Sequence, residues 1–171
     1  MNACEVCGFL RDDVTIHEIP RRIVVSTDSF VELIGLAGDN VSVRPSPERW
    51  SILEYGGHLR DVLISLRERL ITASIEDEPT GVAIHRDERI FLGFYGRDTP
   101  LDVTTELAAI SRLFVRTIES IPPGFDEREM FFSPASPHRV SVLWLGAQAL
   151  HESEHHLSDV RENLERLTVQ S

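Results

Sequence analysis

Long amphipathic segments bounded by helix-capping residues are the feature that most constrains the fold of this chain. Within residues 47–74, apolar side chains recur with the spacing of one helical face, at Ile52, Leu59, Val62, Leu63, Leu66 and Leu70. Ser46 is placed to cap this helix, and Pro47 suits its first turn. The pattern therefore predicts a helix from about Pro47 to Ser74.

Three further segments carry similar signals. Asp98 or Thr99 can cap a helix with Pro100 inside its start, and the sequence "PPG" at 122–124 ends it. A last helix is expected from about Val140 to Leu167, and a first one from Arg21 to the turn near "GLAGDN". The β-branched residues of "RRIVVST" leave a strand open as an alternative at that first position. Four amphipathic helices with one long connection, between the second and the third, predict an all-α four-helix bundle.

Length and charge limit the organisation and the class of partner. A chain of 171 residues with 42% apolar content can bury one sizeable core, so we expect a bundle over 21–171 preceded by an irregular segment at 1–20. The net charge of −11 argues against binding to nucleic acid or to an anionic membrane. The sequence shows no signal-peptide pattern and no apolar run of spanning length, so a cytoplasmic protein is expected.

The last predicted helix contains an unusual concentration of histidines and acids, "ALHESEHHLSDV" at 149–160. Its buried stripe should be formed by the apolar residues Val142, Leu145, Ala149, Val160, Leu164 and Leu167. On a helical wheel, Glu152 and His156 fall on or beside this stripe, four residues apart. His151 and His155 fall on the far side, so we expect them at the surface or at a subunit contact.

The pattern H-L-x-D-V occurs twice, at His58–Val62 and at His156–Val160. A bundle could bring the two helices together, so that His58, Glu152 and His156 form a site for a divalent metal. Three protein ligands leave open coordination positions, as in catalytic sites. Asp61 and Asp159 each follow a histidine by three residues and could orient its imidazole, or could face solvent. The alternative for the whole pattern is an ordinary solvated helix face.

The two cysteines form a separate motif near the N-terminus. Cys4 and Cys7 lie in "CEVCGF", which resembles the C-x-x-C-G zinc knuckle, in which two thiolates supply half of a tetrahedral site. Two further ligands would have to come from histidines, carboxylates or a partner chain. A surface or redox dithiol is the alternative, and a third option is that one cysteine joins the His58 site.

The motifs together resemble those of the DinB-like superfamily, which includes the metal-binding domain of mycothiol-dependent maleylpyruvate isomerase. The resemblance runs from about Val24 to Leu167, and rests on "WSILEYGGHLRDVL", with Trp50 eight positions before His58, and on "HESEHHLSDV". It implies a four-helix bundle with one metal ligand from the second helix and two from the last. Carried over position by position, these ligands are His58, Glu152 and His156, holding zinc or, as alternatives, nickel or iron.

The resemblance also implies a class of activity. Several members are thiol-dependent enzymes in which the metal activates a low-molecular-weight thiol, mycothiol among them, for transfer to an electrophile. We therefore expect a metal-dependent thiol S-transferase or isomerase-like enzyme acting on a small electrophilic substrate, with thiol or water as the nucleophile. The alternative is a non-enzymatic metal-binding or ligand-binding bundle, and a homodimer is open in either case.

The sequence identifies no catalytic acid, base or nucleophile beyond the metal ligands. Arg60, Arg86, Arg89 and Tyr95 could line a pocket for an anionic thiol or substrate, or could be ordinary surface and packing residues.

Overall fold

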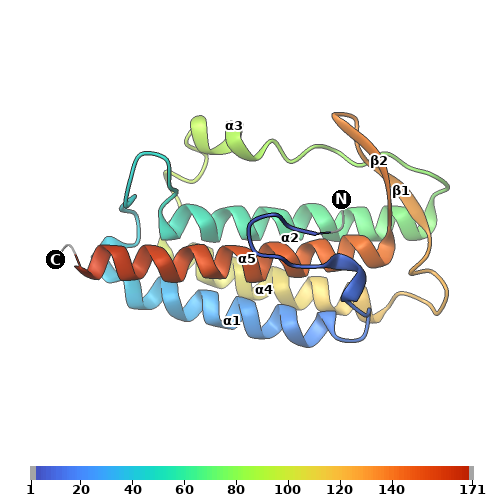
Figure 1. The fold of residues 1–171 in the computed structure, drawn as a ribbon, viewed down its shortest axis with the longest axis horizontal. Coiled ribbons are helices and arrows are strands. Elements are labelled where there is room, and N and C mark those ends of the chain that lie inside the picture. Colours follow the sequence, from blue (N-terminus) through green and yellow to red (C-terminus); the bar gives the residue numbers. More distant parts are fainter. Residues whose placement is uncertain (1–2, 170–171) are drawn as a thin grey trace.

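The structure, a computed structural model that describes residues 3–169, is built around four long helices (Figure 1). These are α1 (Ile19–Ala37), α2 (Ile52–Ile75), α4 (Pro100–Glu119) and α5 (Val142–Val169). Their apolar faces meet in one core, whose largest fully buried side chains include Phe30, Leu59, Leu63, Phe114 and Leu145. The predicted all-α four-helix bundle is thus confirmed.

The order of packing places α2 beside α5. Helices α1 and α2 each pack against both α4 and α5. In Figure 1, α2 and α4 run in one direction, and α1 and α5 run in the opposite one. The long connection after α2 makes this possible, because it returns the chain along the bundle before α4 begins (Figure 1). The two helices that carry the predicted metal ligands are consequently antiparallel neighbours.

The start of α2 differs from the prediction. The helix begins at Ile52 rather than at Pro47, and Ser46 lies in the preceding turn. The N-cap is Ser51, whose hydroxyl accepts a hydrogen bond from the Glu54 amide at 3.2 Å, while the Glu54 carboxylate accepts one from the Ser51 amide at 2.8 Å. This capping box satisfies two donors at once, which a serine five residues earlier cannot do.

Other boundaries are closer to the prediction. α4 begins at Pro100 with Thr99 as its N-cap, one of the two predicted caps. α1 begins at Ile19, two residues before the predicted start, and is helical throughout, so the strand alternative is wrong. α5 begins at Val142, two residues after the predicted Val140.

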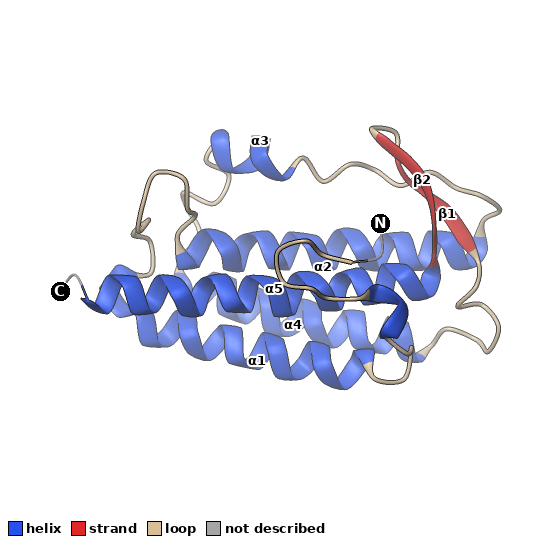
Figure 2. Ribbon diagram, viewed as in Figure 1, coloured by secondary structure: helices blue, strands red, loops and turns tan. Residues whose placement is uncertain are grey.

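The connections contain structure that the sequence did not predict (Figure 2). β1 (Glu129–Ser133) and β2 (Ser136–Ser141) form an antiparallel hairpin that leads directly into α5. A short helix, α3 (Arg86–Phe91), lies in the long connection, and 3₁₀ turns lie at Arg11–Asp13 and Gly38–Asn40. No single-segment periodicity reveals these elements, because each is too short to show one.

The N-terminal segment is folded against the bundle. Residues 3–10, here called the cysteine hairpin, form a tight loop in which the Cys4 amide donates to the Phe9 carbonyl at 2.9 Å. In Figure 1 this loop lies across α5. The face of α5 that points away from α1 and α2 is therefore covered at this position.

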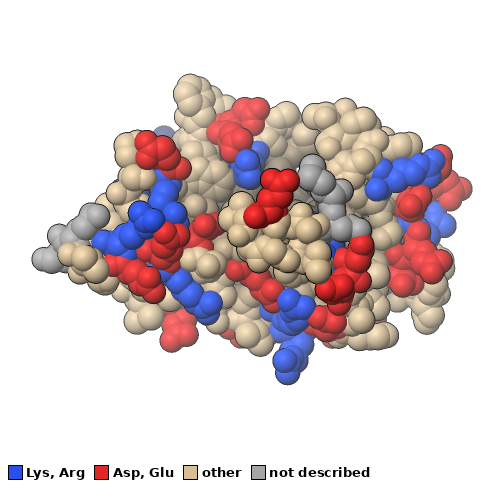
Figure 3. All heavy atoms as spheres, viewed as in Figure 1, with Lys and Arg blue, Asp and Glu red and all other residues tan. Residues whose placement is uncertain are grey.

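Acidic and basic side chains are interspersed on the face of the molecule shown in Figure 3. Several pair across short distances, such as Arg22 with Glu154 at 2.8 Å and Arg49 with Glu162 at 3.1 Å. Among the described residues, no helix combines the length and the apolar character needed to span a membrane.

Candidate metal centre

Helix α2 carries His58 into the bundle two turns after its capping box. The side chain is 2% exposed, and the edge of the Trp50 ring packs on it with 5.1 Å between ring centroids. Neither ring nitrogen has a hydrogen-bond partner among the described residues. A buried polar group without a partner costs about 1–3 kcal/mol, so the position of His58 requires a compensating interaction.

Helix α5 places Glu152 and His156 opposite His58, one helical turn apart and therefore on the same face. Glu152 Oε2 lies 3.2 Å from His156 Nε2 and 3.7 Å from His58 Nε2. One ligand atom from each of the three residues lies within 4.8 Å of the other two. The structure thus brings together, from α2 and α5, the three residues selected from the sequence. Two imidazoles and a carboxylate at this separation fit a divalent cation such as Zn²⁺.

The charges of these groups suit metal binding. Burial alone would raise the pKa of Glu152, but its contacts with His151, His156 and His58 hold that pKa well below its ordinary value. Burial lowers the pKa of His58. Glu152 and His58 therefore have the protonation states that coordinate metals, an ionised carboxylate and a neutral imidazole. Burial would lower the pKa of His156 as well, but its contacts with Asp159 and Glu152 raise it.

Asp159 is placed to orient one of the imidazoles. Its Oδ2 lies 2.9 Å from His156 Nδ1, so Nδ1–H can donate to the carboxylate while Nε2 faces Glu152. Such outer contacts fix the tautomer and the angle of a metal-binding imidazole.

Asp61 does not orient the imidazole of His58, which was one of the two roles considered for it from the sequence. Its carboxylate accepts a hydrogen bond from the Tyr95 hydroxyl at 3.1 Å and also pairs with Arg60 and Arg89. The long connection supplies Tyr95 and Arg89, and these groups satisfy Asp61 away from the His58 ring. Arg60, Arg89 and Tyr95 are accordingly packing and ion-pair residues.

A cavity of about 270 Å³ adjoins the triad. It is lined by His58, Val62, Ser65, Leu66, Arg69, Ile84, Arg86, Phe132, Gln148 and Glu152. The guanidinium groups of Arg69 and Arg86 favour an anionic group in this space. Larger hollows of about 600 and 550 Å³ lie between α1 and α4 and between α2 and α4, and include none of the triad residues.

Two residues of this cavity were not identified from the sequence. Arg69 is buried and stacks over the Phe132 ring with 4.2 Å from Cζ to the centroid. Gln148 donates from Nε2 to Glu152 Oε1 at 2.5 Å. Arg69 lies on the buried face of α2 among apolar residues, and that placement was a signal that could have drawn attention to it.

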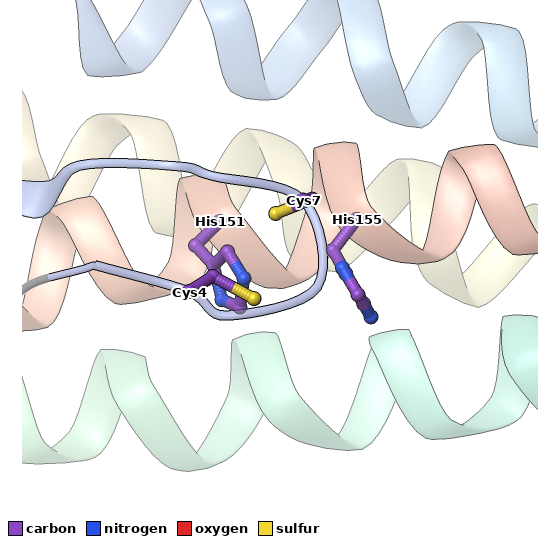
Figure 4. Close-up of side chains that lie close together, drawn as sticks. All are labelled: Cys4, Cys7, His151 and His155. Carbon is purple, nitrogen blue, oxygen red and sulfur yellow. The ribbon is translucent and has the colours of Figure 1, made fainter.

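The remaining predicted residues gather in a second group. Cys4 and Cys7 lie with His151 and His155 (Figure 4). Among the described residues neither cysteine groups with His58, so the option that a cysteine joins the triad is not what the structure shows. The prediction that His151 sits at the surface is wrong, since its ring is 7% exposed, and His155 is partly buried. The helical wheel shows only which face of α5 meets the other helices of the bundle. The opposite face, which carries His151, is covered by the cysteine hairpin, and the wheel cannot show that contact.

The Cys4 thiol differs from an ordinary one. Hydrogen bonding from the Cys7 backbone, the largest influence, lowers the pKa of Cys4 to about 6 against the effect of burial. Burial raises the pKa of Cys7. Both cysteines are free thiols in this structure.

Comparisons with known proteins agree with this fold. The family model of the DinB superfamily matches residues 24–160. The solved structure of YfiT from Bacillus subtilis, described as a probable metal-dependent hydrolase with an unusual four-helix bundle topology, superposes with a TM-score of 0.80. The two share 14% sequence identity, over 90% of this chain and 87% of YfiT. Comparison with curated protein sequences finds no match. The family match covers most of the chain and confirms the resemblance inferred from the motifs, so this chain belongs to the DinB superfamily.

Proposed function

We propose that this protein is a metal-dependent enzyme that activates a low-molecular-weight thiol, or water, for attack on a small electrophilic substrate. The observation that carries the proposal is that the imidazole of His58 is buried and that neither of its nitrogens has a hydrogen-bond partner among the described residues. The ring faces an ionised Glu152 at 3.7 Å and borders a cavity. A divalent cation between these groups would satisfy the imidazole and the carboxylate together.

Each group of the centre has a part in this chemistry. A bound Zn²⁺ would supply Lewis acidity, which lowers the pKa of a thiol or water and so creates a nucleophile at neutral pH. His58, Glu152 and His156 would hold the ion and leave coordination positions open, while Asp159 keeps the His156 ring in place through Nδ1.

The cavity supports an enzyme over a purely structural site. It lies against two of the three triad residues, and Arg69 and Arg86 would hold an anionic group of the thiol or of the substrate. Superfamily membership and the description of YfiT as a probable metal-dependent hydrolase also support metal-dependent chemistry. The preference for a thiol rests on the resemblance to thiol-dependent members of the superfamily.

The metal site is tested by elemental analysis of tag-free protein in which Cys4 and Cys7 are serines, so that only this centre contributes. We expect one ion per chain, lost in His58→Ala and in His156→Ala but retained in His17→Ala, which alters an exposed loop histidine. Glu152→Gln should weaken binding without abolishing it, since the amide keeps an oxygen but loses the charge. Unchanged metal content in both histidine variants would refute the assignment.

The activity is tested separately with zinc-loaded protein. Conjugation of mycothiol to chlorodinitrobenzene reports thiol transfer, and release of nitrophenol from nitrophenyl acetate reports hydrolysis. We expect at least one rate to exceed that of His58→Ala. If the metal is bound and neither rate differs from that of the variant for these or related electrophiles, the non-enzymatic alternative is favoured.

A further inference from the structure

We propose that Cys4, Cys7, His151 and His155 bind a second ion, Zn²⁺, in a closed structural site that fastens the cysteine hairpin to α5. One ligand atom from each of these residues lies within 4.8 Å of the other three. Figure 4 shows the loop with both cysteines lying over α5, beside the two histidines. Tetrahedral zinc places its sulfur and nitrogen ligands about 3.3–3.8 Å apart, so small side-chain rotations would complete the site.

The spacing of the ligands supports the same ion. Cys4 and Cys7 have the C-x₂-C spacing, and His151 and His155 have the H-x₃-H spacing on one helix. These are the two half-sites of Cys₂His₂ zinc sites, where they follow one another closely in sequence. Here the fold, not the sequence, brings the two halves together, because the hairpin packs across α5.

The backbone of the cysteine hairpin itself holds the cysteine half-site in shape. Gly8 has a φ of +72°, a conformation that side-chain-bearing residues rarely adopt, and its amide donates to the Cys4 carbonyl at 2.9 Å. The hairpin is also anchored beside the histidines. The Phe9 ring packs on His151 with 5.3 Å between centroids, and Arg11 donates from Nε to Gln148 Oε1 at 2.6 Å.

The histidine half-site has the unpaired atoms that a ligand requires. His151 Nε2 and His155 Nδ1 are buried and have no hydrogen-bond partner among the described residues. The opposite nitrogen of each ring lies near a carboxylate, His151 Nδ1 3.7 Å from Glu152 and His155 Nε2 3.8 Å from Asp159. Metal-binding imidazoles commonly direct their other N–H at such a group.

Binding through His151 Nε2 requires a modest rearrangement. Nδ1 then carries the ring proton, whereas Arg11 Nη2 now lies 3.2 Å from it as a donor. With the ion bound, Nδ1–H would donate to Glu152 and Arg11 would keep its bond to Gln148. Two thiolates and two neutral imidazoles neutralise Zn²⁺, and the thiol protons pass to solvent.

The proposed role is structural because four protein ligands fill the tetrahedron. The triad, by contrast, has three ligands and a cavity beside it. The second ion would fix the N-terminal segment over the face of α5 that the bundle leaves uncovered. Its presence does not depend on whether the triad is catalytic or binds metal at all.

Elemental analysis of the tag-free full chain, purified with a reductant, tests the proposal. We expect two zinc ions per chain in the wild type, and one in the Cys4→Ser/Cys7→Ser variant and in His58→Ala. Replacement by Co²⁺ distinguishes the sites, since only a cysteine-ligated ion gives an intense sulfur-to-cobalt charge-transfer band in the near ultraviolet. That band should persist in His58→Ala and disappear in the double-serine variant.

The cysteines lie outside the helical core, so their replacement should leave the far-ultraviolet circular dichroism of the bundle unchanged. His155→Gln, which removes one ligand on α5, provides a second route and should weaken the cobalt band. A wild-type protein without the band, or a metal ratio that the double-serine change leaves unaltered, would overturn the second site. Failure of the triad would instead appear as a ratio of one with the band retained.

Discussion

Replacement of His58 by leucine should raise the stability of the protein in the absence of zinc, and zinc should reduce or reverse that gain. The His58 ring is 2% exposed, and neither nitrogen is hydrogen-bonded to a described residue. Leucine has a similar size and no polar atom. The change therefore removes an unsatisfied group while keeping most of the packing against Trp50 and the core. Glu152 loses its 3.7 Å contact with His58 but keeps the shorter one with His156.

The size of the effect follows from the cost of an unpaired buried group. Removing that cost should raise the free energy of unfolding of the metal-free protein by about 1–3 kcal/mol. For a chain of this length, each kcal/mol corresponds to a shift in Tm of about 2–4 °C. With zinc at a hundred times the Kd of the triad, the wild type gains about 2.7 kcal/mol in its free energy of unfolding, which the variant cannot gain. The stability advantage of the variant over the wild type should therefore shrink or reverse.

The same substitution at His156 provides a matched control. His156 Nδ1 lies 2.9 Å from Asp159, and its Nε2 lies 3.2 Å from Glu152, so leucine there leaves carboxylates without their partner. His156→Leu should therefore destabilise the metal-free protein, although it resembles His58→Leu in size and position. The contrast separates hydrogen-bond satisfaction from any general effect of an apolar residue at this place.

Urea unfolding followed by circular dichroism measures the free energy of unfolding of the wild type, His58→Leu and His156→Leu, first with a chelator and then with excess zinc. The second proposed site is unaltered in all three proteins, so it is equally empty with chelator and equally filled with excess zinc, and it cancels from the comparison. If His58→Leu destabilised the metal-free protein as much as His156→Leu, then His58 would already be satisfied without metal. The reasoning from its unpaired nitrogens would then be refuted.

Three further predictions concern the helices, each measured by urea unfolding of metal-free protein. Ser51→Ala should cost about 1 kcal/mol because it removes the N-cap of α2, whereas Ser46→Ala should stay within about 0.5 kcal/mol; equal effects would contradict the observed cap. Burial alone would raise the pKa of Glu54, but hydrogen bonds with a nearby guanidinium and the Ser51 amide lower it from 4.5. The ionised Glu54 therefore stabilises the protein above pH 4.5, and this stabilisation is lost as the pH falls through the lowered pKa of Glu54. The destabilisation caused by Glu54→Gln should accordingly shrink in acid, and a difference in stability that stays constant with pH would contradict this. Gly35→Ala should stabilise α1 by about 0.5–1 kcal/mol because its position is open. Gly56→Ala should instead destabilise, because the new carbon would lie 2.7 and 3.0 Å from methyl carbons of α4 and α1.

The bundle was predictable because each long helix carries its own apolar period and stop signals. The start of α2 shows where such reasoning fails. Ser46 followed by Pro47 is a common start, but Ser51 with Glu54 three residues later is the capping-box pattern and satisfies more backbone donors. The sequence contained that signal. The β1–β2 hairpin and α3 had no comparable signal, because their few residues are held by contacts with distant parts of the chain. Strand β1 pairs with residues 79–81, and α3 is held through Arg89 and Asp61.

The candidate site divides in the same way. His58 and Glu152 were accessible to sequence reasoning because the facing helices are regular and the wheel shows which side meets the bundle. The orienting role considered for Asp61 could not be decided from the sequence, because two of its partners, Arg89 and Tyr95, come from the irregular connection after α2. The grouping of His151 with Cys4 depends on how the N-terminal hairpin folds, and the period of α5 contains no information on that.

Glu152 connects the two groups of histidines on α5. Its Oε2 faces His58 and His156, while its Oε1 accepts a hydrogen bond from Gln148 and lies 3.7 Å from His151 Nδ1. Glu152 Oε2 is directed at His58 and His156 because Gln148 holds Oε1 from the opposite side. His151, which the helical wheel set apart from the metal site, is thus a neighbour of the ligand that carries the charge of that site. Adjacent positions on one helix can in this way belong to two centres, since each faces a different partner and a single carboxylate reaches both.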